Sequence, residues 1–342
     1  MTSTCLDKIL GRFPDLSVAV VGDFFLDKYL VVDRAVSETS LETGKEAFQV
    51  VGVRQSPGAA GTVVNNLAAL GAGRLYAVGL TGDDGAGYEL RQGLAEQGVA
   101  LHYLRRTPDF LTPTYTKPME LLPGGGEREM HRLDLKNRRP LSREAEETVL
   151  ADLHEVVTRA KALVIADQVQ ERNCGVITDR VREALARLGA ERPELVILVD
   201  SRVRAGEFRE VMLKPNREEA RAALEREAVA EDAALGQSLS RQSGRPVFLT
   251  CGLEGMMVCT AEEAVAVPAA PVSGPVDIVG AGDSAAAALT LSLCAGASPV
   301  EAAIVGNLAA SVTVQQLGTT GTARPEQVRE RFRECANRYA PF

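Results

Sequence analysis

The chain has 342 residues, of which 45% are hydrophobic and 25% charged, a composition typical of a globular protein with a sizeable core. Its formal net charge of −8 argues against a general nucleic-acid binder, although one loop can still bind phosphate in an acidic protein. Six scattered cysteines without a Cys-x-x-Cys pair are typical of reduced thiols in a cytoplasmic protein. No stretch reaches the roughly 20 apolar residues that would span a membrane. These features predict a protein that acts on a small molecule, with neither nucleic acid nor membrane as its partner.

Short apolar runs alternate with amphipathic segments along most of the chain. Buried strands that alternate with helices predict an α/β fold with a mostly parallel sheet and helices on both of its faces. The expected strands cover 17–23, 75–80, 162–166, 195–199, 211–213 and 247–250, and the expected helices cover 61–70, 87–97, 142–159, 174–188 and 217–227.

Two stretches, 31–56 and 102–132, break this alternation. Both are rich in Thr, Val and charged residues, and the Pro-Gly-Gly-Gly run at 123–126 is typical of a hairpin turn. Long insertions of this kind are commonly lids or binding loops. We therefore expect a small β lid over the strand ends, within a single domain of residues 1–342. A flap that contacts a second copy of the chain is a compatible alternative.

The residues that carry the clearest chemistry are Asp-Ile-Val-Gly-Ala-Gly-Asp at 277–283, directly before an Ala-rich helical pattern. Glycines let the backbone approach a ligand closely, and N–H groups at a helix start bind anions. We expect the N–H groups of Gly280, Ala281 and Gly282 to form an anion hole. Asp283, at its mouth, could take a proton from an attacking hydroxyl group. A plainer alternative is that Asp283 only caps the helix.

At this motif the chain resembles the ribokinase-like carbohydrate kinases of the PfkB family, whose D-T-x-G-A-G-D ends in the catalytic base. Further motifs follow in the family's order, and the resemblance runs from about Val18 to Thr322. The resemblance implies a ribokinase-like three-layer sandwich with a β lid, ATP and Mg²⁺ as cofactors, and a homodimer formed through the lid. The motifs are Val-Gly-Asp-x-x-Leu-Asp at 21–27, the Gly-rich signature at 57–71, Val-Gly-x-x-Gly-x-Asp at 78–84, Lys-Pro-Asn-x-x-Glu at 214–219 and Thr-x-Gly-x-x-Gly at 250–255.

The form of the first strand is closest to the heptose-phosphate kinase branch of that family, so a sugar or sugar phosphate is the implied substrate. Asp23 and Asp27 stand at a strand end, where α/β sheets place ligands, and Asp27 matches the sugar-binding carboxylate of the family. Asp167 matches another strand-end carboxylate of that branch, although a solvated turn residue is an equal alternative. The signature adds Gly58, Thr62 and Asn66 to the implied substrate site.

A second group of residues is expected on the nucleotide side. Asn216 and Glu219 lie three residues apart, on one face of a first helical turn, and could hold Mg²⁺ through water. A helix-capping pair is the plainer alternative. Asp277 matches a ligand of a monovalent cation such as K⁺. Residues expected near ATP are Asn216, Glu219, Thr250, Gly252, Gly255 and Asn307.

Departures from the family pattern motivate a second hypothesis, a catalytically silent sugar- or nucleotide-sensing protein on the same fold. Ala59 stands at the second glycine of the signature pair, and Thr62 stands at an Asn. A dinucleotide-dependent dehydrogenase is disfavoured because no Gly-x-Gly-x-x-Gly follows the first strand. Several arginines could clamp a sugar phosphate, with solvated surface positions as the alternative: Arg105, Arg106, Arg128, Arg132, Arg138 and Arg139.

Overall fold

A computed structural model describes residues 1–225, 231–318, 320–340 and 342. Within these residues a nine-stranded sheet forms the centre of the molecule, in the order β14-β13-β12-β11-β10-β9-β1-β4-β5. The strands from β12 to β5 run parallel, while β13 and β14 are antiparallel at one edge. Their bounds are β1 Ser17–Gly22, β4 Arg74–Gly82, β5 Leu104–Thr107, β9 Ala162–Asp167, β10 Val196–Ser201, β11 Met212–Leu213, β12 Val247–Thr250, β13 Met256–Cys259 and β14 Ala264–Val267.

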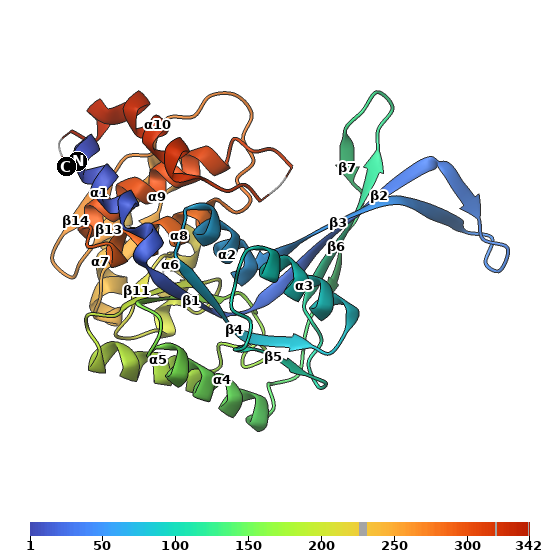
Figure 1. Cartoon of the computed structure of the whole chain (residues 1–342), viewed down its shortest axis with the longest axis horizontal. Coiled ribbons are helices and arrows are strands. Elements are labelled where there is room, and N and C mark those ends of the chain that lie inside the picture. Colours follow the sequence, from blue (N-terminus) through green and yellow to red (C-terminus); the bar gives the residue numbers. More distant parts are fainter. Residues whose placement is uncertain (226–230, 319, 341) are drawn as a thin grey trace.

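Helices cover both faces of this sheet because its central strands are apolar on both sides (Figure 1). Even and odd positions of β1 enter two different cores, with Val18 and Val20 in one and Ala19 and Val21 in the other. The expected three-layer, ribokinase-like α/β sandwich is therefore confirmed. One layer holds α1 Ser3–Gly11, α2 Ala60–Ala69, α3 Gly85–Glu96, α8 Ala281–Cys294, α9 Pro299–Thr313 and α10 Pro325–Cys335, and the other holds α4 Arg143–Val156, α5 Asp179–Glu191, α6 Arg217–Ala223 and α7 Asp232–Ser243.

A second sheet, which we call the flap, projects from one side of this body (Figure 1). Its long strands β2 and β3 are antiparallel, and β6 runs parallel to β2. Residues 104–107, inside the range expected for the lid, instead form β5 of the central sheet, because Leu104 packs into a buried core beside β4. The flap consists of β2 Phe24–Thr39, β3 Glu46–Ala59, β6 Thr114–Leu121, β7 Glu127–Glu129 and β8 Leu133–Leu135.

The largest difference between an expected and an observed helix end is at the start of α5 Asp179–Glu191. A helix was expected from residue 174, but α5 begins at Asp179 because the Thr178 hydroxyl caps it by accepting the Val181 N–H. The helix expected at 217–227 ends at Ala223, and residues 226 and 227 lie outside the described part of the chain. None of the helices in the described ranges combines the length and the apolar character that crossing a bilayer requires.

Candidate active site

The glycine turn at the start of α8 has the shape of an anion-binding loop. Gly280 adopts φ 82°, a left-handed conformation that favours glycine, and α8 begins at the next residue. The N–H group of Ala281, which was predicted to contribute to an anion hole, instead donates to Ile278 O at 3.2 Å within the turn. The N–H groups of Gly280, Gly282 and Asp283 meet no acceptor among the described residues. Three amide donors, with the positive end of the helix dipole, therefore remain at this turn.

Asp283 lies in the first turn of α8, and charged groups from β2, from β10 and from the loops after β10 and β11 act on its carboxyl group. Burial raises its pKa to about 7, with a further contribution from the carboxylate of Asp200 at the end of β10. Lys214 and Arg202 oppose this increase, and Asp27 on β2 adds to it. A carboxyl group whose pKa lies near neutrality is suited to taking up a proton during a reaction.

Lys214 and Asp200 form a buried ion pair beneath the glycine turn, and neither was predicted from the sequence. Lys214 Nζ lies 2.9 Å from Asp200 Oδ2. A methyl group added at Gly282 would lie 3.4 Å from Lys214 Nζ, so the ammonium group is directly next to the turn. Burial lowers the pKa of Lys214, but the carboxylates of Asp200, Glu219 and Asp283 together raise it above the ordinary value. Lys214 is therefore a fixed positive charge at the place where the turn could receive an anion.

Asn216 and Glu219 form a capping box at the start of α6. The Asn216 side chain accepts from the Glu219 N–H at 2.9 Å, and Glu219 Oε2 accepts from the Asn216 N–H at 2.8 Å. Burial raises the pKa of Glu219, and the nearby Asp200 carboxylate raises it further. Among the described residues, no three His, Cys, Asp or Glu side chains are arranged to hold a metal directly. The oxygen donors of Glu219 and Asp200 fit a hydrated Mg²⁺, which keeps several of its waters.

On the flap side, Asp27 faces the same centre as Asp283. Its carboxyl group is largely buried, and Lys117 Nζ of β6 lies 3.9 Å from its Oδ1. A methyl group added at Gly58 would lie 2.4 Å from Asp27 Oδ2, so only glycine leaves room for this carboxylate. The structure thus brings Asp27 and Gly58 together, as the sequence indicated.

Asp23 does not face this centre, which corrects its expected place in the substrate site. Its carboxylate is 2% exposed and accepts three backbone N–H groups, from Gln168 at 3.0 Å, Val169 at 3.1 Å and Val176 at 2.7 Å. Burial raises the pKa of Asp23 to about 6 in spite of these bonds. Asp23 therefore anchors the loop after β9 to the end of β1.

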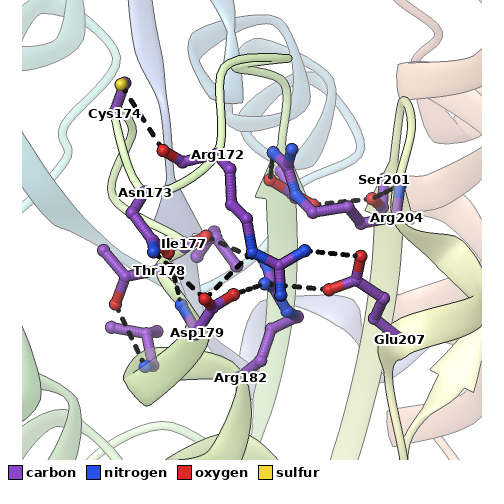
Figure 2. A network of polar contacts seen from close by, with 12 residues as sticks. Arg172, Asn173, Cys174, Ile177, Thr178, Asp179, Arg182, Ser201, Arg204 and Glu207 are labelled. Carbon is purple, nitrogen blue, oxygen red and sulfur yellow. Dashed lines mark hydrogen bonds and ion pairs between the residues drawn. The ribbon is translucent and has the colours of Figure 1, made fainter. Parts of the chain in front are cut away.

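Asp167 is also committed to the protein itself, and its expected substrate role needs the same correction. Its carboxylate is 1% exposed, accepts from Ser201 Oγ at 2.6 Å and pairs with Arg204 at 2.8 Å. Figure 2 shows Arg204 and Ser201 beside a second network, in which Arg172 and Arg182 both reach Asp179 and Glu207. These contacts fasten the loops that follow β9 and β10.

Thr62 and Asn66 of α2 were expected to contact substrate, but both are buried, at 2% and 0% exposure. Asn66 Nδ2 donates to Thr62 O within the helix at 3.0 Å. A methyl group added at Gly280 would lie 3.6 Å from Thr62 Cγ2. Thr62 therefore lies next to the glycine turn, and Asn66 is bonded within α2.

The residues expected at the nucleotide have mixed surroundings. Thr250 Oγ1 donates to Pro215 O at 3.3 Å, next to the capping box. Asn307 Nδ2 donates to Val267 O at 3.0 Å and Pro268 O at 3.1 Å, so its amide group fixes the end of β14 instead of facing a ligand. Gly252 and Gly255 both have positive φ, 61° and 103°, in the turn between β12 and β13.

The carboxylate of Asp277 closes the loop before α8. Its Oδ1 accepts from Val279 N at 3.0 Å, and its Oδ2 accepts from Gly318 N at 3.2 Å. Each oxygen keeps a lone pair for the expected monovalent cation.

Most of the candidate clamp arginines are exposed and pair with carboxylates of the protein itself. Arg105 pairs with Asp152 and Arg128 with Glu120, each at 2.6 Å. Arg132 differs because its Cζ also lies 4.5 Å from the centre of the Tyr115 ring, and Tyr115 pairs in register with Asp27. Lys136 Nζ lies 5.8 Å from the same ring. Lys117, Arg132 and Lys136 therefore form a group of cations around Tyr115 and Asp27, which we call the flap cation group.

The family model described as "pfkB family carbohydrate kinase" matches residues 16–326, and the chain belongs to this family. It is 31% identical over 329 residues to the Bifunctional protein HldE of Azorhizobium caulinodans and 29% identical over 322 residues to that of Gluconobacter oxydans. The alignments cover 95% and 93% of this chain but only 66% and 64% of those proteins.

Solved structures of low sequence identity share the fold. Phosphofructokinase-2 from Escherichia coli in complex with potassium matches with a TM-score of 0.70 at 19% identity, covering 94% of this chain and 99% of that one. Ribokinase from Arabidopsis thaliana, complexed with ribose and ATP, matches with a TM-score of 0.63 at 19% identity, covering 92% and 98%.

Proposed function

We propose that this protein transfers the γ-phosphoryl group of ATP to a hydroxyl group of a sugar or sugar phosphate. The observation that carries the proposal is the position of Asp283. Its carboxyl group, with a pKa raised to about 7 by burial, lies in the same turn as three N–H groups that meet no described acceptor, and beside buried Lys214. A proton acceptor and a set of anion donors therefore meet at one point, as phosphoryl transfer to an alcohol requires.

In this mechanism Asp283 takes the proton of the acceptor hydroxyl group while the oxygen of that hydroxyl group forms a bond to the γ-phosphorus. The bond between that phosphorus and the β,γ-bridging oxygen breaks, and ADP leaves. The N–H groups of Gly282 and Asp283, together with Lys214, stabilise the charge on the phosphoryl oxygens. Asp27 accepts hydrogen bonds from the sugar and orients it. Glu219 and Asp200 would hold Mg²⁺ through water, and the bound ion would neutralise part of the negative charge of the nucleotide phosphates.

The flap cation group favours an acceptor that carries a phosphate. Arg132 and Lys136 lie over the Tyr115 ring, Lys117 lies beside Asp27, and Arg132 also pairs with Asp134. Excess positive charge beside a sugar-binding carboxylate suits a sugar phosphate. A solved phosphofructokinase-2 of this fold is a complex with fructose-6-phosphate, and the first strand resembles the heptose-phosphate branch. We therefore place heptose phosphates first among the candidate substrates.

A substrate panel tests this function. The protein is incubated with ATP, Mg²⁺ and heptoses, hexoses, pentoses or their phosphates, and ADP release is measured. We expect ADP release above the ATP-only background for at least one phosphorylated sugar, and a weaker response to the same sugar without phosphate. If ATP analogues bind without any ADP release across the panel, the silent sensing protein is the better hypothesis.

We also propose that the flap forms a homodimer. Phe48, Val50, Val51 and Val53 of β3 are each 45–55% exposed, and a hydrophobic surface of this kind commonly marks an interface. Sedimentation velocity should show a dimer for the wild type and a monomer for a Phe48→Glu, Val53→Glu double variant. Leu253→Glu is the control, because Leu253 is 85% exposed outside the flap and its substitution should leave the dimer intact. A monomeric wild type at micromolar concentration would contradict this proposal.

A further inference from the structure

A second cavity, which we call the basic pocket, lies between the loop after β5 and the start of α4. Its volume is about 400 Å³, within the range that is usual for small-molecule sites. Its lining comes from residues 107, 109–111 and 136–142, together with Ala145 of α4. None of the described residues of the glycine turn, the proton acceptor or the capping box lines it. The basic pocket is therefore separate from the place where phosphoryl transfer is proposed.

The charges that line the basic pocket are mostly positive. Lys136, Arg138 and Arg139 contribute three cations, and Asp109 is the one carboxylate among its described lining residues. Arg138 Nη1 lies 3.7 Å from Glu171 Oε1, a long distance for an ion pair, and its side chain is 78% exposed. Lys136 and Arg139 form no ion pair with a carboxylate in the described part of the chain. This excess of positive charge favours an anionic ligand.

The other walls of the basic pocket are largely apolar and are tied together before any ligand binds. Phe110 is 5% exposed and Leu111 is 49% exposed. Asn137 Oδ1 accepts from Leu111 N at 3.0 Å, and Asn137 Nδ2 donates to Leu111 O at 2.7 Å. Leu141 N donates to Asn173 O at 2.7 Å. Apolar surface beside several cations suits an organic phosphate better than a free inorganic ion.

Two residues of the basic pocket also reach the acceptor side of the active site. Lys136 and Asn137 line a smaller cavity together with Phe25 and Tyr115. Lys136 Nζ lies 5.8 Å from the centre of the Tyr115 ring, and Tyr115 pairs in register with Asp27. The ammonium group of a lysine is a single charge on a flexible stem, so it cannot serve anions in both cavities at once. An anion in the basic pocket would therefore compete with an acceptor phosphate for Lys136.

We propose that the basic pocket is a regulatory site for a small organic phosphate that carries a second anionic group. Arg138 and Arg139 bind the ligand, and the bound ligand draws Lys136 away from the Tyr115 ring. The flap cation group then lacks one of its three cations, so a phosphorylated acceptor binds more weakly while Asp283 is unaffected. The ligand thus raises the KM of the acceptor and leaves kcat unchanged. Binding at this site is independent of the proposed function, and only the effect on the acceptor rests on it.

Calorimetry with phosphoenolpyruvate tests the binding step. This probe carries a phosphate and a carboxylate and has no hydroxyl group that could be phosphorylated. We expect it to bind the wild type without ATP, and the Arg138→Ala, Arg139→Ala double variant to bind it at least about tenfold more weakly, because charge-assisted hydrogen bonds are lost. Both arginines are exposed, so the double variant should unfold at the wild-type temperature.

Arg143→Ala is the matched control for this titration. Arg143 is 84% exposed at the start of α4, beside the basic pocket, but it pairs with Glu147 and does not line the pocket. Its substitution removes the same charge and should leave the affinity for phosphoenolpyruvate unchanged. Equal binding by the double variant and the wild type, or no binding by the wild type at millimolar concentration, would overturn the proposal.

Kinetics with the best phosphorylated sugar of the substrate panel test the regulatory step. Phosphoenolpyruvate should raise the acceptor KM of the wild type by at least about threefold at constant kcat, and it should have no effect on the Arg138→Ala, Arg139→Ala variant. Without the probe, this variant should have the wild-type kcat and acceptor KM. An equal rise of KM in both proteins would place the probe in the acceptor site and refute the regulatory site. An unchanged KM in a wild type that binds the probe would also refute regulation. If no sugar is phosphorylated, the proposed function fails, and the titration alone decides whether the basic pocket is a binding site.

Discussion

Asp283→Asn is expected to lower kcat by roughly two orders of magnitude or more while nucleotide affinity is retained. The substitution keeps the shape of the side chain and the N–H groups of the turn, but it removes the group that accepts the proton. Coupled measurement of ADP release and direct titration with an ATP analogue would check both parts. Arg187→Ala serves as a control for unspecific effects of substitution, because Arg187 is exposed on α5, outside the site.

The same substitution has an expected signature in pH dependence. With a pKa of about 7, Asp283 is half protonated near neutrality, so wild-type kcat/KM should rise as pH increases through 7 and then level off. The carboxyl group contributes stability below the pKa of the unfolded chain, and this contribution is lost as pH rises through the folded pKa, because the native site resists ionisation. Asp283→Asn should therefore be more stable than the wild type at pH 8, by about 1–3 kcal/mol, and not at pH 4.

Two results would contradict this account of Asp283. Turnover of the Asn variant close to that of the wild type would remove Asp283 as the proton acceptor. Equal thermal unfolding of both proteins at pH 8 would show that the carboxyl group ionises without cost in the native state, which would contradict a raised pKa of Asp283.

The fold could be predicted because its signals are local. Apolar strands such as 162–166 and the amphipathic segments between them need only nearby residues to be recognised. The turn at 277–283 was recognised for the same reason, since consecutive glycines before a helix have a direct backbone consequence. The flap was harder, because Leu104–Thr107 is polar enough to suggest an insertion and joins the central sheet only through pairing with β4.

Asp23 and Asp167 do not take their expected places because the partners of their carboxylates lie far along the chain. Asp23 accepts from N–H groups 145, 146 and 153 residues further on, which no local pattern reveals. Lys214 and Asp200 were not predicted because they lie at the ends of two different strands. Their ion pair forms only because β10 and β11 are neighbours in the sheet. A strand-end carboxylate thus indicates the correct edge of the sheet without distinguishing a ligand from a loop anchor.

One departure from the family signature places a non-glycine residue in an unfavourable backbone conformation. Ala59 adopts φ 53° and ψ −117° where the resembling signature has a glycine. A side chain in this region costs on the order of 1–3 kcal/mol. Neighbouring contacts hold the conformation, since Ala60 N donates to Asp23 O at 3.0 Å and Phe24 pairs with Ala59. The junction between β3 and α2 is therefore kept in the glycine-like shape without the glycine.

Arg204→Ala is expected to lower the free energy of unfolding by about 3–5 kcal/mol, the largest stability effect that we predict. Arg204 is 6% exposed and pairs with Asp167, which is 1% exposed. Its guanidinium group also donates to Gln170 O at 2.9 Å and to Val169 O. The alanine variant leaves the Asp167 carboxylate buried without its cation and releases the loop whose N–H groups hold Asp23. Chemical denaturation should show a lower midpoint with an unchanged slope.

A double variant separates the buried charge from the loss of packing. If the penalty arises mainly from the uncompensated Asp167 carboxylate, Arg204→Met combined with Asp167→Leu should recover a large part of it, because both charges then leave the interior together. Arg241→Ala is the control, as Arg241 is exposed and bonds to Ala261 O and Ser238 Oγ at the surface, where substitutions cost little. A double variant no more stable than Arg204→Ala would show that the hydrogen bonds to the 168–170 loop, and not the ion pair, fasten this edge of the site.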